Sequence, residues 1–138
     1  MLEKFLVLTV FAQVMLTFSV MYIMGKRRFA AAKEHLIEKS AFTAMRLDSA
    51  PDEVRIADRH FINQFEIPTL FYVAAVTALA VKAVSVWFVA FSLVFVITRY
   101  AHSVVHLGKN QVLLRYRLFL IGCVMCLAQW LVLLINLL

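Results

Sequence analysis

The chain has 138 residues, of which 64% are hydrophobic and only 16% are charged. Soluble domains are about 45–50% apolar, so this composition excludes an ordinary soluble domain and predicts an all-α integral membrane protein in contact with membrane lipids. The net charge of +6 is explained by basic residues beside anionic lipid headgroups, and we expect no nucleic-acid partner.

Four apolar runs, at 5–24, 61–81, 83–97 and 118–138, predict four transmembrane helices. A span needs about 20 residues, so the third run is long enough only if it continues through Arg99 and His102 toward Leu107. We expect a single domain over 1–138, a four-helix bundle with helices at about 2–38, 52–81, 83–107 and 111–138. The basic cluster follows the first run, which indicates a retained helix and not a signal peptide.

Lysine and arginine are concentrated in two of the three connections. Eight of the 14 lie between Gly25 and His60, and four lie between Arg99 and Arg117. The positive-inside rule therefore predicts that the 25–60 and 107–112 connections are cytoplasmic and that both termini lie on the other side. The compact connections favour a bacterial inner membrane.

The long 25–60 connection contains a predicted helix start. Ser49 is a candidate N-cap, with Pro51 in the first turn and Asp52 and Glu53 close behind, and these residue types are favoured at those positions. We therefore expect the second helix to begin in the cytoplasm, before it enters the membrane.

Polar residues form a stripe along this second helix. Arg55, Arg59, Asn63 and Glu66 are spaced at i, i+4, i+8 and i+11, which places them on one face. Pro68 follows the deepest of them and removes a backbone hydrogen bond to Gln64, so we expect the helix to open or kink beside Glu66.

The other helices carry polar residues at a similar depth. Arg99, His102 and His106 lie at i, i+3 and i+7 on the third helix, Arg115 begins the apolar part of the fourth, and Arg28 ends that of the first. Because polar groups in a membrane usually face a bundle interior or a cavity, we expect a cationic pocket for a small polyanionic ligand. Its predicted residues are Arg28, Arg59, Asn63, Glu66, Arg99, His102, His106 and Arg115.

A purely structural interpretation is also open. Arg59 and Arg115 can extend to lipid headgroups, Glu66 can pair with an arginine of another helix, and the histidines can lie at the membrane interface. Cys123 and Cys126 form a CxxC spacing, but no other cysteine is available to complete a tetrahedral site. We expect these two to be packing residues, and we expect no metal site.

Two segments resemble the MAPEG family, the membrane-associated proteins in eicosanoid and glutathione metabolism. Residues 59–68, RHFINQFEIP, are similar to the family's RxxxNxxE…P signature, and residues 99–109, RYAHSVVHLGK, are similar to the third-helix segment of one member, microsomal prostaglandin E synthase. The resemblance implies a homotrimer that binds glutathione between subunits near the cytoplasmic face.

The resemblance also implies roles for single residues. Arg28, Arg59, Asn63, Glu66 and His102 would hold glutathione, and Arg115 would be the catalytic residue that stabilises the glutathione thiolate, since a nearby cation lowers the pKa of a thiol. The sequence departs from that synthase at three positions, where His106, Tyr116 and Phe119 replace a tyrosine, a serine and a tyrosine. Glu66 and Pro68 are also one residue apart, whereas that synthase separates them by three.

These observations lead to one expected function and two alternatives. The expected function is a glutathione-dependent membrane transferase or peroxidase that acts on lipophilic electrophiles or lipid hydroperoxides, with glutathione as co-substrate. The first alternative is a non-catalytic lipid-binding or scaffold protein of the same fold. The second, a small multidrug transporter, is disfavoured because the many arginines would repel cationic drugs.

Overall fold

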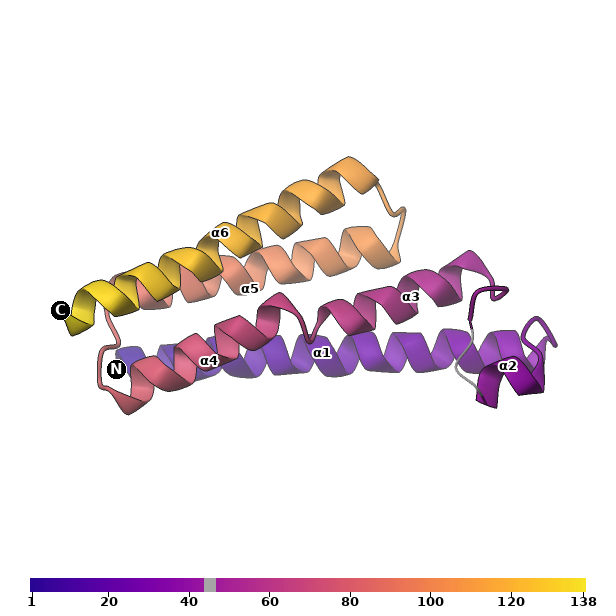
Figure 1. The fold of residues 1–138 in the computed structure, drawn as a ribbon, viewed down its shortest axis with the longest axis horizontal. Coiled ribbons are helices and arrows are strands. Elements are labelled where there is room, and N and C mark those ends of the chain that lie inside the picture. The colour runs from indigo at the N-terminus through magenta and orange to yellow at the C-terminus, as the bar shows by residue number, and fades with distance from the viewer. Residues whose placement is uncertain (44–46) are drawn as a thin grey trace.

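A computed structural model describes residues 1–43 and 47–138, and all regular structure in these residues is helical (Figure 1). Arg46, one of the basic residues of the 25–60 connection, lies outside the described residues. The helices are α1 (Leu2–Lys33), α2 (Lys39–Thr43), α3 (Asp52–Asn63), α4 (Ile67–Ala80), α5 (Val86–Leu107) and α6 (Val112–Leu137). The expected all-α class is therefore confirmed.

The long helices run side by side, and both chain ends lie at one end of the bundle (Figure 1). Among the described residues, α1, α5 and α6 are each long and apolar enough to cross a membrane. The chain is thus an integral membrane protein with three candidate spans. The expected second span, 52–81, consists of two shorter helices, α3 and α4, of 12 and 14 residues.

The break between α3 and α4 lies where Pro68 was expected to open the helix. α3 ends at Asn63, α4 starts at Ile67, and Pro68 occupies the first turn of α4. Proline has no N–H to donate and is tolerated in a first turn, so its position forces a helix to restart there. The open or kinked backbone beside Glu66 is therefore confirmed.

Two predicted helix boundaries need correction. The first helix ends at Lys33, not near 38, because His35 takes a left-handed conformation with a φ of 56° that a helix cannot continue through. The expected N-cap at Ser49 is wrong: Pro51 is the N-cap residue of α3. A residue that precedes proline avoids the helical region, so Ala50 keeps the helix from starting earlier.

Small and aromatic residues build the apolar core. Ala74, Ala75 and Ala78 on α4 are fully buried and pack with Leu6 of α1 and Phe88 of α5. Small side chains let helix backbones approach closely, which is how helices associate where lipid offers no hydrophobic driving force. α4 is thereby held against α1, α5 and α6.

Buried amides link the helices inside the bundle. The Gln129 amide on α6 donates to the Ser92 hydroxyl on α5 at 2.6 Å, and the Gln13 amide on α1 donates to the Gln64 side-chain oxygen at 3.3 Å. Both Gln13 and Gln129 are fully buried. Such interhelical hydrogen bonds contribute about 0.6–2 kcal/mol each in membrane proteins.

Replacing Ser92 with alanine leaves the Gln129 amide without its acceptor and is expected to lower the free energy of unfolding by about 0.6–2 kcal/mol. Ser19→Ala is the matched control, because the exposed Ser19 hydroxyl donates only within its own helix, to the Met15 carbonyl. Denaturant titration of both variants in detergent measures the difference. Equal stability of the two variants would show that the Gln129–Ser92 bond contributes nothing.

Candidate functional site

An open pocket of about 1040 Å³ lies between α3, α5 and the start of α6. Its volume is at the upper end of the 300–1,000 Å³ that is usual for small-molecule sites. Polar and charged side chains supply much of its lining: Asp52, Arg55, Arg59, Asn63, Glu66, His102, His106, Asn110, Arg115 and Tyr116.

The predicted stripe of the second helix forms one wall of this pocket. Arg55, Arg59 and Asn63 line it from one face of α3, and Glu66 lines it from the break between α3 and α4. The side chains of Arg59 and Glu66 are exposed and Asn63 is half-buried. Among the described residues, neither Arg59 nor Glu66 takes part in an ion pair, so both charges are available to a ligand or to another chain.

The opposite wall holds Arg115 in a fixed position. One of its terminal nitrogens, Nη1, donates to the Asn110 side-chain oxygen at 2.7 Å and to Nε2 of His106 at 3.2 Å. The Arg115 backbone carbonyl is 3.0 Å from Nδ1 of His102. These contacts join the end of α5 to the start of α6 and place a guanidinium on the pocket wall.

Two of the predicted pocket residues do not line this pocket. Arg28 forms an ion pair with Asp58 between α1 and α3. Arg99 is 3% exposed and lies behind the wall, with its Cζ 5.1 Å from the centre of the Phe119 ring and 5.9 Å from that of Phe95. Aromatic faces attract a guanidinium, so the two rings partly offset the cost of burying this charge.

Gly122 provides the space for Arg99 on α6. A Cβ atom at this position would lie 3.2 Å from the Thr98 hydroxyl oxygen and 3.6 Å from Nε of Arg99. The Thr98 hydroxyl is itself held by a 2.7 Å hydrogen bond to the Phe95 carbonyl. A side chain at this position would therefore crowd a buried cation that has little room to move.

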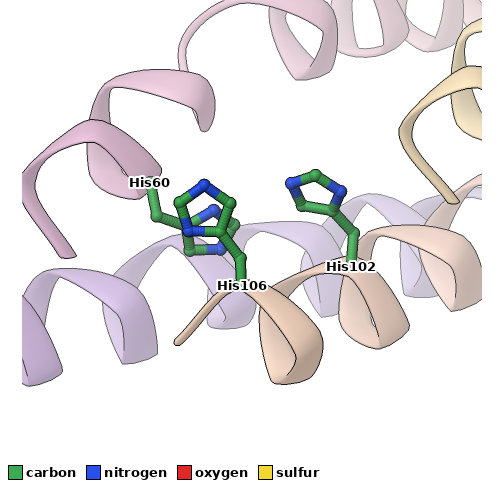
Figure 2. A group of neighbouring side chains, drawn as sticks. All are labelled: His60, His102 and His106. Atoms are coloured by element: carbon green, nitrogen blue, oxygen red, sulfur yellow. The ribbon is translucent and has the colours of Figure 1, made fainter. Parts of the chain in front are cut away.

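His60 is a residue of this region that the sequence argument missed. It is fully buried on α3, and its ring stacks on His106 (Figure 2) with centroids 4.7 Å apart. Its Nε2 is 2.8 Å from the Ser103 hydroxyl. His60 was overlooked because it follows Arg59 directly, and neighbouring helix residues point in different directions. The sequence feature that could have identified His60 is its four-residue spacing from Gln64, which predicts a second polar face on this helix.

The comparisons with known proteins assign the chain to a family. The sequence model of the MAPEG family matches residues 6–135, nearly the whole chain, and the chain belongs to the MAPEG family. No curated protein and no solved structure matches the chain. The likeness of residues 99–109 to microsomal prostaglandin E synthase stays a prediction.

The crowding at Gly122 gives a direct test of this site. Gly122→Ala is expected to be less stable than Gly25→Ala by about 1–3 kcal/mol, because alanine favours both helices alike but the methyl group at position 122 overpacks against Thr98 and Arg99. Gly25→Ala is the matched control: no atom lies within 4 Å of a Cβ there, and alanine favours a helix by about 1 kcal/mol over glycine. Denaturant titration in detergent compares the two, and a Gly122→Ala protein as stable as Gly25→Ala would contradict the close packing.

Proposed function

We propose that the chain is a glutathione-dependent membrane transferase or peroxidase that acts on lipophilic electrophiles or lipid hydroperoxides. The observation that carries the proposal is the position of Arg115, a guanidinium on the wall of a large pocket whose opposite wall presents Arg59, Asn63 and Glu66. Members of the MAPEG family generally use glutathione, which adds support from outside the structure.

The pocket's charges suit the chemistry of glutathione. This tripeptide has two carboxylates, an ammonium group and a thiol. Arg55 and Arg59 can bind carboxylates through paired hydrogen bonds, and Glu66 can accept from the ammonium group. The exposed Tyr116 and the half-buried Phe119 add apolar lining beside Arg115, where a lipophilic co-substrate would meet the thiol.

Arg115 is proposed to stabilise the thiolate. A cation beside a thiol lowers the thiol pKa and raises the reactive fraction at neutral pH. In a transferase reaction, the thiolate attacks an electrophilic carbon and a C–S bond forms. A leaving group such as chloride then departs with the electrons of its bond or, in an addition to an activated double bond, the resulting carbanion takes up a proton. In a peroxidase reaction, it attacks the terminal peroxide oxygen, the O–O bond breaks, and the alkoxide takes up a proton and leaves as an alcohol. The resulting sulfenic acid then reacts with a second thiol to give a disulfide and water.

The thiol is proposed to come from the ligand and not from the chain. Cys126 is buried and packs with Phe71 and Phe95, away from the pocket lining, and Cys123 is half-buried on the same helix. Neither cysteine lines the pocket. Both therefore fit the packing role expected from the sequence.

We also propose that α3 and α4 together make a fourth membrane crossing and that the protein is a homotrimer. Glu66 lies beyond the 25–60 connection and is exposed on a single chain, and an exposed charge at membrane depth is costly. A neighbouring subunit that covered the open side of the pocket would remove this cost and complete a site between subunits. The proposed orientation puts the pocket end, with the 25–60 and 107–112 connections, in the cytoplasm of a bacterial cell.

A non-catalytic lipid-binding or scaffold protein is the second candidate. Phe119 favours it, because its apolar ring replaces a tyrosine hydroxyl that the resemblance would place in the pocket. The two candidates differ in one respect that can be measured, which is whether a thiol bound in the pocket becomes ionised.

Replacing Arg115 with alanine is expected to lower transferase turnover about tenfold or more, since one unit of thiol pKa changes the thiolate fraction about tenfold near neutral pH. Turnover is measured with 1-chloro-2,4-dinitrobenzene as the electrophile. The ultraviolet absorbance of the thiolate reports the ionisation of bound glutathione. Arg117→Ala is the control, because Arg117 is exposed and does not line the pocket. Unchanged turnover in Arg115→Ala would remove this residue from the mechanism.

Glutathione binding is tested by calorimetric titration of the detergent-purified protein and of an Arg59→Ala, Glu66→Ala double variant. Saturable binding is expected for the unchanged chain and loss of at least about tenfold in affinity for the variant, because two charged contacts are removed. A Glu3→Ala, Lys4→Ala variant removes one acid and one base at the far end of α1 as a control. Absence of binding at millimolar glutathione would favour the scaffold candidate.

A further inference from the structure

Three buried histidines meet between α3 and α5 (Figure 2). His60 is fully buried, and His102 and His106 are each 4% exposed. One ring nitrogen of each histidine lies within 4.8 Å of the others. His102 and His106 also line the large pocket, so the cluster has a route to the outside.

The hydrogen bonds of His60 fix which of its nitrogens is available. The Ser103 hydroxyl donates to the Arg99 carbonyl at 2.8 Å, so its oxygen accepts from Nε2 of His60 at 2.8 Å. The contact with Ser103 is shorter than the 3.3 Å contact between the Gln64 amide nitrogen and the same nitrogen of His60, so the Ser103 contact determines the tautomer and Nε2 carries the proton. Nδ1 of His60 therefore carries a lone pair, and it is buried with no hydrogen-bond partner among the described residues.

His102 shows the same arrangement. Its Nδ1 donates to the Arg115 carbonyl at 3.0 Å, because a carbonyl oxygen can only accept. Nε2 of His102 therefore carries a lone pair, and within residues 1–43 and 47–138 it too is buried without a partner. Histidines that ligate metals are held in this way, with the second nitrogen donating to an oxygen of the protein.

His106 differs, because its Nε2 accepts from Arg115. A guanidinium can only donate, so the proton of His106 lies on Nδ1. If a metal ion took Nε2, it would replace Arg115 directly. If it took Nδ1, the proton would have to move to Nε2, which would then face the donating guanidinium. In both cases His106 can become a ligand only after its hydrogen bond with Arg115 breaks.

We propose that His60, His102 and His106 form a site for a divalent transition-metal ion such as Zn²⁺, and that metal binding and the Arg115–His106 hydrogen bond exclude each other. Three imidazoles are a suitable ligand set for such ions and leave a fourth position open toward the pocket. Ligand nitrogens 2.0–2.1 Å from Zn²⁺ lie roughly 3.3 Å apart, so the rings must turn inward to close on the ion. The positive charges of Arg99 and Arg115 beside the cluster oppose the ion and favour an anionic fourth ligand.

The proposal goes beyond the proposed function and is tested without glutathione. The chelator-treated full chain in detergent is titrated with Co²⁺, whose visible absorption reports tetrahedral coordination, and then with Zn²⁺. One ion per chain is expected. His60→Gln should weaken binding about tenfold or more by removing a ligand. His35→Asn is the matched control, because the exposed His35 is the fourth histidine of the chain and asparagine tolerates its φ of 56°.

A second variant separates a folding defect from a lost ligand. Arg115→Gln should tighten metal binding about tenfold, because it frees His106 and removes a cation, and a folding defect cannot produce such a gain. No saturable binding at millimolar metal, or binding that His35→Asn abolishes and His60→Gln does not, would overturn the metal site. Unchanged affinity in Arg115→Gln would overturn the mutual exclusion. These titrations contain no glutathione. Their results therefore test the metal site independently of the proposed glutathione-dependent function.

Discussion

Pro68 cannot donate a backbone hydrogen bond, and the rest of the site depends on how the chain accommodates this. α3 ends at Asn63 and α4 begins at Ile67, so the residues between them are released from a continuous helix. Gln64 turns inward, where its oxygen accepts from Gln13 of α1, while Glu66 is exposed on the pocket. The break therefore supplies both an interhelical bond and a carboxylate for the pocket.

Burial of charge in the apolar bundle imposes a second constraint. Arg99 has no carboxylate partner among the described residues, and its Nε and Nη2 atoms are buried without a hydrogen bond there. What surrounds it is polarisable or small: the Phe95 and Phe119 rings, and Gly122 across the interface with α6. This arrangement tolerates a cation without neutralising it, so the positive potential extends to the histidines and to the pocket beyond them.

Sequence patterns predicted what depends on local chemistry. Hydropathy gave the three long spans, the acidic pair at Asp52 and Glu53 marked the start of α3, and helical spacing placed Arg59, Asn63 and Glu66 on one wall. The depth of a residue in the membrane does not determine the direction in which its side chain points around the helix axis. Arg28 was expected in the pocket from its depth and from the family resemblance, but Asp58 on the neighbouring helix pairs with it. His60 was missed for the same reason, since only the packing of α3 on α5 shows that it faces His102 and His106.

Arg115 connects the two proposals about this pocket. Its hydrogen bonds within the described residues use only Nη1, on Asn110 and His106, which leaves its other donors for a thiolate. A metal ion on the three histidines would break the bond to His106 and would itself attract an anion to its open position. The pocket would then have two ways to stabilise a thiolate, one through the guanidinium and one through the ion. Because the ion and Arg115 compete for His106, the occupancy of the histidines would decide whether Arg115 is held by His106 or is free to turn toward the sulfur.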